Sequence, residues 1–215
     1  MGHLRRVLPI SRVYGLDRGD PIDRYFIRKF LSAHQDVIRG RVLEVGGSHY
    51  TRKFGGERVC KSDVLHIVEG HPEATIIGDL AKGDALPSDT FDCFICTQTL
   101  QYIPDVDAAV STIYRILKPG GTLLATIPCT PYNNPQLDPW GYFSTFTRSY
   151  AQREFQKRFP ARNLEIKGYG NVLVLIAYLT GMSVQELTAE ELNYQDEDYQ
   201  FLTTVKAVKP GHNGV

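Results

Sequence analysis

Glycine and acidic residues stand together where a predicted strand ends, a place suited to holding a nucleoside. The stretch LEVGGSHYTRKFGG begins as an apolar strand, continues with Glu44 and turns at Gly46 and Gly47. Glycine tolerates a positive φ and lets backbone N–H groups approach a ligand closely. A glycine pair alone is equally typical of a plain turn, so the residues further along the chain decide between the two interpretations.

A second carboxylate follows at a spacing that nucleoside-binding folds use. Asp63 lies on the next apolar segment, 19 residues after Glu44. A carboxylate about 20 residues beyond a glycine turn is placed to accept hydrogen bonds from ribose hydroxyls. We therefore predict that Asp63 and the adjacent Val64 bind a cofactor. The alternative is that Asp63 is a solvated loop acid or a helix cap.

Two further groups of polar residues follow later strands. Asp79 comes after a short apolar segment and is suited to meet an adenine amino group, with Leu80 packed on the ring. Thr97 and Gln98 end the run FDCFICTQ, at the edge of the sheet where doubly wound folds bind ligands. The later stretch LKPGGTLLATIP is a helix, a turn and a strand, whose glycines we interpret as structural.

A long loop is predicted to form the part of the site that does not contact the nucleoside. The segment TPYNNPQLDPWGYFSTFT is rich in proline, asparagine and aromatic residues and has no periodicity. Loops of this kind after a sheet strand are more often functional than filler. Side chains that could take up a proton as a general base are His49, Asp138 and Tyr132. A wall or a sugar-stacking platform is predicted from Trp140, Tyr142, Phe143 and Phe146, with loose core packing as the alternative.

The elements that must position these residues alternate along the chain. Helices are predicted over 21–38, 106–117, 149–159 and 171–182, and strands over 41–47, 57–67, 74–80, 91–98, 122–129, 163–170 and 199–210. Apolar strands separated by helices or loops favour a parallel sheet covered on both faces. The acidic stretch 186–200 is predicted to lie on the surface.

Composition bounds the class of protein. The chain has 215 residues, enough for one sizeable core, and 24 basic residues balance 24 acidic ones. The balanced charge therefore gives no overall electrostatic attraction for nucleic acid or an anionic membrane. Cys93 and Cys96 form a CxxC inside an apolar run, which favours buried strand residues over a metal or redox pair. The histidines show no paired ligand spacing, so no metal is indicated.

The chain is expected to act in the cytoplasm. The start, MGHLRRVLPISRVYG, has arginines but no long apolar core, so it does not resemble a signal peptide. The longest apolar run, 171–182, is shorter than the roughly 20 residues that span a bilayer. The cysteines form no disulfide framework, as expected of a reducing compartment.

Together these motifs resemble a class I S-adenosylmethionine-dependent methyltransferase. VLEVGG resembles its first motif, Asp63 its ribose-binding acid and Asp79 with Leu80 its adenine-side motif, while FDCFICTQTLQYIPD and LKPGGTLL resemble later family segments. The resemblance is closest to a bacterial type-11 branch associated with glycan and secondary-metabolite pathways. It implies a Rossmann-like, doubly wound α/β fold whose seven-stranded, mostly parallel sheet ends in an antiparallel strand.

The sequence departs from the family pattern at two points. Ser48 and Tyr50 stand where the family commonly has glycine, so Ser48 is expected to make the turn and to bond the cofactor, whereas Tyr50 narrows the site. Tyr102 stands where the family often has histidine, so no catalytic base is carried over there. Tyr25 and Arg24 are expected either to close over the cofactor or to pack a helix.

We therefore expect one methyltransferase domain over 1–215, with an N-terminal helical cap (1–39), a cofactor-binding core (40–130) and an acceptor loop with C-terminal strands (131–215). It would transfer methyl from S-adenosyl-L-methionine to an oxygen of a small sugar or pathway intermediate. A degenerate, non-enzymatic binding module and a nicotinamide dehydrogenase are the alternatives, and the second lacks its glycine pattern here. No nucleic-acid or membrane partner is expected; a homodimer is the candidate assembly.

Overall fold

A computed structural model describes residues 5–130 and 140–211. Its strands are β1 (Gly40–Val45), β2 (Val59–His66), β3 (Ile76–Ile77), β4 (Phe91–Thr97), β5 (Leu117–Pro128), β6 (Leu164–Tyr169) and β7 (Leu202–Val208). Its α-helices are α1 (Ile22–Ala33), α2 (Val106–Ile116), α3 (Arg148–Gln156), α4 (Val172–Thr180) and α5 (Ala189–Asn193). None of these helices combines the length and the apolar character needed to cross a bilayer.

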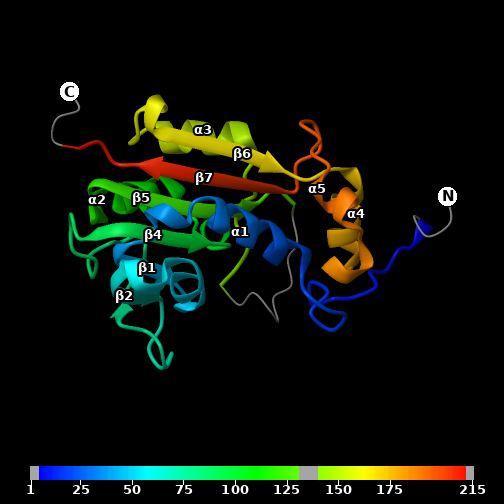
Figure 1. Cartoon of the computed structure of the whole chain (residues 1–215), viewed down its shortest axis with the longest axis horizontal. Helices are drawn as coiled ribbons and strands as arrows, with labels where there is room; N and C mark the ends of the chain where they lie inside the picture. The colour runs from blue at the N-terminus through cyan, green and yellow to red at the C-terminus, as the bar shows by residue number, and fades with distance from the viewer. Residues whose placement is uncertain (1–4, 131–139, 212–215) are drawn as a thin grey trace.

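The strands form one seven-stranded sheet in the order β3-β2-β1-β4-β5-β7-β6 (Figure 1). Neighbouring strands from β3 to β5 run parallel, whereas β7 pairs antiparallel with both β5 and β6. The chain reverses its direction of travel across the sheet between β1 and β4, which is where a doubly wound sheet opens a crevice at its strand ends. The predicted fold class, antiparallel last strand included, is confirmed.

Two apolar cores cover the two faces of the sheet, because successive strand residues point to opposite sides. On β4, Phe94 and Cys96 join the core beneath α2 and α3, whereas Cys93 and Ile95 join the core beneath α1 and α4. The interpretation of the CxxC as buried strand residues is confirmed. Burial raises the pKa of the Cys96 thiol to about 12, so this side chain stays neutral.

The structure corrects two predicted elements. Strand β5 begins at Leu117, so the LKPGG stretch belongs to the strand instead of forming a separate turn. Gly121 has no room for a side chain, because an added Cβ would lie 2.8 Å from the Phe91 carbonyl oxygen on β4. The acidic stretch 186–200 contains helix α5, which Thr188 caps by accepting from the Glu191 N–H.

Candidate functional site

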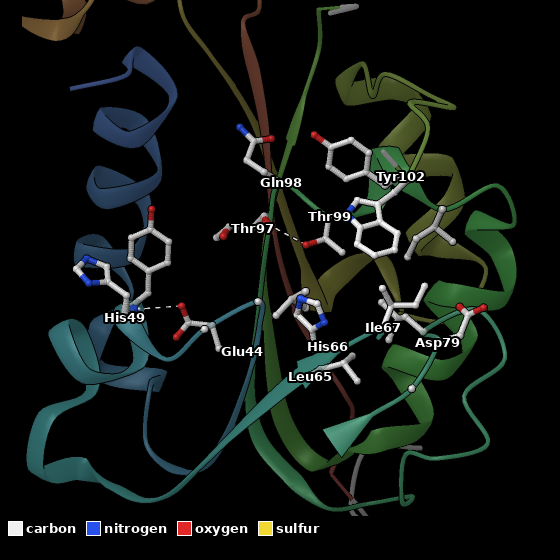
Figure 2. Close-up of a pocket in the computed structure, with 18 of the residues that line it drawn as sticks. Glu44, His49, Leu65, His66, Ile67, Asp79, Thr97, Gln98, Thr99 and Tyr102 are labelled. Atoms are coloured by element: carbon white, nitrogen blue, oxygen red, sulfur yellow. Dashed lines mark hydrogen bonds between the residues drawn. The ribbon is translucent and has the colours of Figure 1, made fainter. Parts of the chain in front are cut away.

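A cavity of about 550 Å³ opens at the carboxyl ends of β1, β2 and β4 (Figure 2). Its size lies within the range of small-molecule sites. In Figure 2, Glu44 and His49 bound one side, Asp79 and Ile67 the opposite side, and Gln98 the top. The full lining is Arg24, Glu44, Val45, Gly46, Gly47, His49, Tyr50, Leu65, His66, Ile67, Gly78, Asp79, Leu80, Thr97, Gln98, Thr99, Tyr102, Ile103 and Trp140.

Glu44 holds the turn that follows β1. Its carboxylate is buried and accepts the backbone N–H groups of Tyr50 at 3.1 Å and Thr51 at 2.7 Å. These donors begin the helical turn Thr51–Gly55, which otherwise leaves its first N–H groups unpaired. Burial raises the pKa of Glu44, while the two backbone donors oppose the rise. Both carboxylate oxygens are therefore engaged in shaping the cavity wall.

Gly46 and Gly47 form an open cradle at the start of this turn. Gly46 has a φ of +80°, which favours glycine, and its N–H is used by the Leu65 carbonyl on β2. A Cβ built at either glycine meets no heavy atom within 4 Å. Both residues line the cavity, so a side chain there would occupy ligand space.

Asp63 does not line the cavity, and its predicted role in cofactor binding stays a prediction. It lies inside β2, opposite Leu43, three residues before the strand ends. Its buried carboxylate accepts from Arg41 Nε at 2.6 Å and from the Thr75 hydroxyl at 3.2 Å. The spacing rule placed an acid near the ribose, but β2 continues beyond Asp63 and presents other residues at its end.

His66 stands at the end of β2, in the place expected for the ribose-binding acid. It lines the cavity between Leu65 and Ile67, and its ring stacks on His71 with centroids 4.7 Å apart. The sequence interpretation missed it because it sought a carboxylate. The signal available was the length of the apolar run that follows Asp63.

The two residues predicted to meet an adenine ring, Asp79 and Leu80, belong to the cavity lining. Leu80 is buried, and Asp79 lies on the opposite side of the cavity from Glu44 in Figure 2. One oxygen of Asp79 accepts the Ala81 N–H at 2.8 Å and so fixes the carboxylate at the rim.

The end of β4 contributes Thr97 and Gln98, as predicted, and also Thr99. Gln98 has a φ of +48°, a left-handed conformation uncommon outside glycine. Its N–H donates to the Thr126 carbonyl on β5, which holds the strained backbone in place. The Thr99 hydroxyl donates to the Thr97 carbonyl at 2.9 Å. Tyr102, from the following turn, lines the same cavity.

Two other predicted cofactor residues lie outside the cavity lining. The buried Ser48 donates its hydroxyl to Glu73 at 2.6 Å, so it ties the turn to the loop after β2. Val64 is buried in β2 and donates its N–H to Thr75. The expectation that Ser48 bonds a cofactor carboxylate is therefore not supported by its geometry.

Two residues of helix α1 were expected to close over the cofactor, and only one of them lines the cavity. Tyr25 lies outside the cavity lining and donates its hydroxyl to Asn193 at 3.0 Å. Arg24 lines the cavity and donates from Nη1 to the Tyr50 hydroxyl at 3.0 Å. Tyr50, the residue in place of a family glycine, is therefore part of the wall.

The predicted acceptor residues separate into three groups. His49 and Trp140 line the cavity, and Tyr142 lines a neighbouring one. Phe143 is exposed, and Phe146 is fully buried in the apolar core, where it contacts Tyr150, so Phe146 is corrected from a substrate platform to core packing. Tyr132 and Asp138 lie outside the described residues.

Part of the sequence is similar to known methyltransferases. Residues 38–125 match the family described as a methyltransferase domain. The ubiquinone/menaquinone biosynthesis C-methyltransferase UbiE of Escherichia coli is 38% identical over 100 residues, which are 46% of this chain and 36% of that protein. The chain thus matches about a third of the length of this relative.

Comparisons of structure agree on the fold. An S-adenosylmethionine-dependent methyltransferase from Archaeoglobus fulgidus superposes with a TM-score of 0.58 at 13% identity, covering 86% of this chain and 94% of that one. The N-methyltransferase NodS from Bradyrhizobium japonicum WM9, in complex with S-adenosyl-L-homocysteine, gives 0.56 at 14% identity, covering 93% of both chains. The resemblance to class I methyltransferases is confirmed.

Proposed function

Because residues 38–125 match a methyltransferase-domain family and the fold is that of class I methyltransferases, we propose that this chain transfers a methyl group from S-adenosyl-L-methionine to an oxygen of a small hydroxylated acceptor. The cavity at the carboxyl ends of β1, β2 and β4 carries the proposal. Bound there, S-adenosylmethionine supplies a methyl group already activated on a sulfonium. The chain's task is to hold the cofactor and to align an acceptor with it.

The lining fits such a cofactor in shape and polarity. The open glycine cradle leaves room beside the turn, and Leu65, Ile67 and Leu80 offer apolar contacts for a flat base. Asp79 presents a carboxylate at the same end, suited to an exocyclic amino group. His66 supplies ring nitrogens near the position proposed for the ribose.

Methyl transfer to carbon is the second candidate, and one observation favours it. The UbiE relatives are C-methyltransferases by name, and 38% identity extends over 100 residues of this chain. The aligned part covers 46% of this chain, and binding of S-adenosylmethionine is common to both reactions. We keep oxygen as the proposed target of methylation because the side chains proposed to contact the substrate accept hydrogen bonds, which suits a hydroxylated molecule.

Calorimetric titration with S-adenosylhomocysteine tests cofactor binding directly. We expect saturable one-to-one binding, with NAD producing no heat under the same conditions. Binding of NAD in place of S-adenosylhomocysteine would support a dehydrogenase. Binding of neither molecule would favour a degenerate module that keeps the fold without the chemistry.

The identity of the methylated atom requires a product measurement. The protein is incubated with S-adenosylmethionine carrying a ¹³C-labelled methyl group and with a panel of hydroxylated small molecules. A methyl carbon bound to oxygen resonates at clearly higher frequency than one bound to carbon. A carbon-bound signal would replace the O-methylation proposal while leaving the cofactor assignment intact.

A further inference from the structure

A second cavity, of about 340 Å³, adjoins the cofactor cavity. Arg24, Gln98 and Tyr102 line both of them. Gln98 and Tyr102 lie together at the top of Figure 2, which marks the side where the two spaces meet. A methyl acceptor must lie next to the cofactor, so its binding site is expected to share residues with the cofactor cavity.

Three residues that line this second cavity each have a side-chain oxygen that is shielded from solvent and has no hydrogen-bond partner within the described part of the chain. The oxygens are Asp23 Oδ1, Gln98 Oε1 and Gln101 Oε1. Buried polar atoms are nearly always paired, so each such atom needs an explanation. All three are acceptors as assigned, and a carboxylate in particular offers only acceptor sites when ionised. A ligand that satisfies them must carry O–H or N–H donors.

Asp23 is the carboxylate among these three groups. It lies in the first turn of α1, and its other oxygen accepts from Gln98 Nε2 at 3.3 Å. Burial raises the pKa of Asp23, while the neighbouring Arg24 opposes the rise. Burial separates Asp23 Oδ1 from water, so this oxygen lacks the hydrogen bond that water would donate. A ligand hydroxyl that donates to Asp23 Oδ1 would replace that hydrogen bond.

Aromatic side chains form the apolar part of the lining. Tyr102 meets Tyr142 edge to face at 5.7 Å, and Tyr14 stacks on Tyr178 at 6.2 Å, centroid to centroid. All four tyrosines line the cavity, along with Pro21 and Pro128. Tyrosine faces pack well against a planar ring and against the C–H face of a sugar. The cavity therefore combines ring-shaped apolar walls with buried acceptors.

We propose that this second cavity is the acceptor site, that it binds a hydroxylated six-membered ring, and that a ring hydroxyl donates its hydrogen bond to Asp23. The proposal rests on the proposed methyltransferase function and assigns its substrate class. A phenol and a sugar share the required chemistry, a ring with hydroxyl donors. Asp23 selects for a free hydroxyl, because an ether or a methyl group at that position leaves the carboxylate unpaired.

The test uses two hydroxylated probes and one matched apolar probe. Catechol represents the arenes, methyl α-D-glucopyranoside represents the sugars, and o-xylene replaces the two catechol hydroxyls with methyl groups of similar size. Each probe is titrated by NMR into the protein saturated with S-adenosylhomocysteine, and the probe that binds best is then soaked into crystals. The variants are Asp23→Ala and the milder Asp23→Asn. Asp36→Asn, an exposed acid three residues beyond α1, is the matched control.

We expect one hydroxylated probe to occupy this cavity and to bind better than o-xylene. Asp23→Ala should weaken that probe about tenfold, the size expected for losing a hydrogen bond to a charged group, and Asp23→Asn should weaken it less. Asp36→Asn should bind as wild type does. The better of the two hydroxylated probes separates an arene acceptor from a sugar.

Failure of this proposal is distinguishable from failure of the proposed function. Wild-type affinity for S-adenosylhomocysteine, measured on the same samples, reports the cofactor site and shows whether each variant is folded. With that affinity retained, two results would overturn the acceptor assignment: neither hydroxylated probe enters the cavity, or Asp23→Ala binds the probe as wild type does. No binding of S-adenosylhomocysteine to wild type would instead remove the proposed function itself.

Discussion

The two adjoining cavities are built in different ways. The cofactor cavity draws mostly on strand ends and the turns that follow them, from Glu44 to Ile103. The second cavity is assembled from distant segments that include Tyr14, Asp23, Gln101 and Tyr178. The first depends on backbone geometry that a parallel sheet imposes, whereas the second depends on side chains that meet only in the folded chain.

This difference predicts how each cavity responds to substitution. A site built on strand ends is rigid, and a change in its turn should disturb stability and cofactor affinity together. A site assembled from loops and helix ends should lose ligand affinity with smaller effects on the rest of the fold. The following substitutions test that contrast.

The largest effect is expected at Glu44. The Glu44 carboxylate accepts two backbone N–H groups, one on each oxygen. In Glu44→Gln the amide oxygen can accept only one of them. The amide NH₂ group then faces the other backbone N–H, which loses its acceptor. We expect a loss of about 3 kcal/mol in the free energy of unfolding, together with weaker binding of S-adenosylhomocysteine. Urea denaturation and calorimetry measure the two effects.

Glu154→Gln is the control for that change. Glu154 is also buried, but its carboxylate accepts from the flexible side chains of Arg153 and Lys157. Its replacement should cost less than about 1 kcal/mol and leave cofactor affinity unchanged. Equal losses at Glu44 and Glu154 would contradict the structural role of Glu44.

Substitutions at Asp63 and His66, which lie on the same strand, should affect stability and cofactor binding separately. Asp63→Asn breaks the buried contact with Arg41 and should cost about 2 kcal/mol of stability without altering cofactor affinity. His66→Ala removes a cavity wall and should weaken S-adenosylhomocysteine about tenfold with little loss of stability. Denaturation and calorimetry on both variants give the comparison. Weaker binding by Asp63→Asn alone would restore its predicted ribose role.

Gly46→Ala tests the cradle against a matched glycine. Gly46 and Gly56 both have positive φ and both leave a Cβ free of contacts within 4 Å, but only Gly46 lines the cavity. Each substitution should cost about 1 kcal/mol of stability from backbone strain. Only Gly46→Ala should also weaken S-adenosylhomocysteine, by about tenfold. Equal affinities in the two variants would place the cofactor elsewhere.

The smallest effect concerns the segment that frames the second cavity. Arg18 pairs with Glu186 and holds the chain between Tyr14 and Pro21, which line that cavity, against the turn Val184–Glu186. Hydrogen bonds from Arg18 and from the Ser183 N–H lower the pKa of Glu186 to about 2. A depressed carboxylate pKa stabilises the fold above the unfolded value of 4.5 and loses that contribution as the pH falls toward 2.

Glu186→Gln should therefore be less stable than wild type at pH 7 by at most about 1 kcal/mol, because the pair is partly solvated. The difference should shrink steadily below pH 4.5 and vanish near pH 2. Urea denaturation across this range measures it. A difference that is independent of pH would show that the Glu186 charge plays no part.

The sequence predicted the cofactor half better than the acceptor half, for a physical reason. The positions of the strands and of the glycine turn follow from local periodicity, and Gly46, Asp79 and Gln98 line the cavity at the strand ends. The arrangement of the strands in the sheet came from the family resemblance. Asp63 was assigned to the ribose from a fixed spacing alone, although the predicted strand 57–67 already extends beyond it, and the structure places Asp63 inside β2.

Residues of the second cavity gave no comparable signal. Asp23 appeared as an ordinary acid in the first turn of a helix, and Tyr178 as part of an apolar run. Their shared role depends on how α1 and α4 pack against the sheet, which periodicity alone does not specify. Phe146 was misjudged for the same reason, since its loop enters the core.

Gln98 has a consequence for how two ligands would affect each other. Its left-handed backbone costs on the order of 1 kcal/mol, and its side chain lines both cavities. A ligand in one cavity that eases or increases this strain changes the affinity of the other cavity for its own ligand. The second ligand changes the affinity for the first by the same factor. Relief of strain at this single residue would make the two bindings cooperative, so that either ligand prepares the chain for the other.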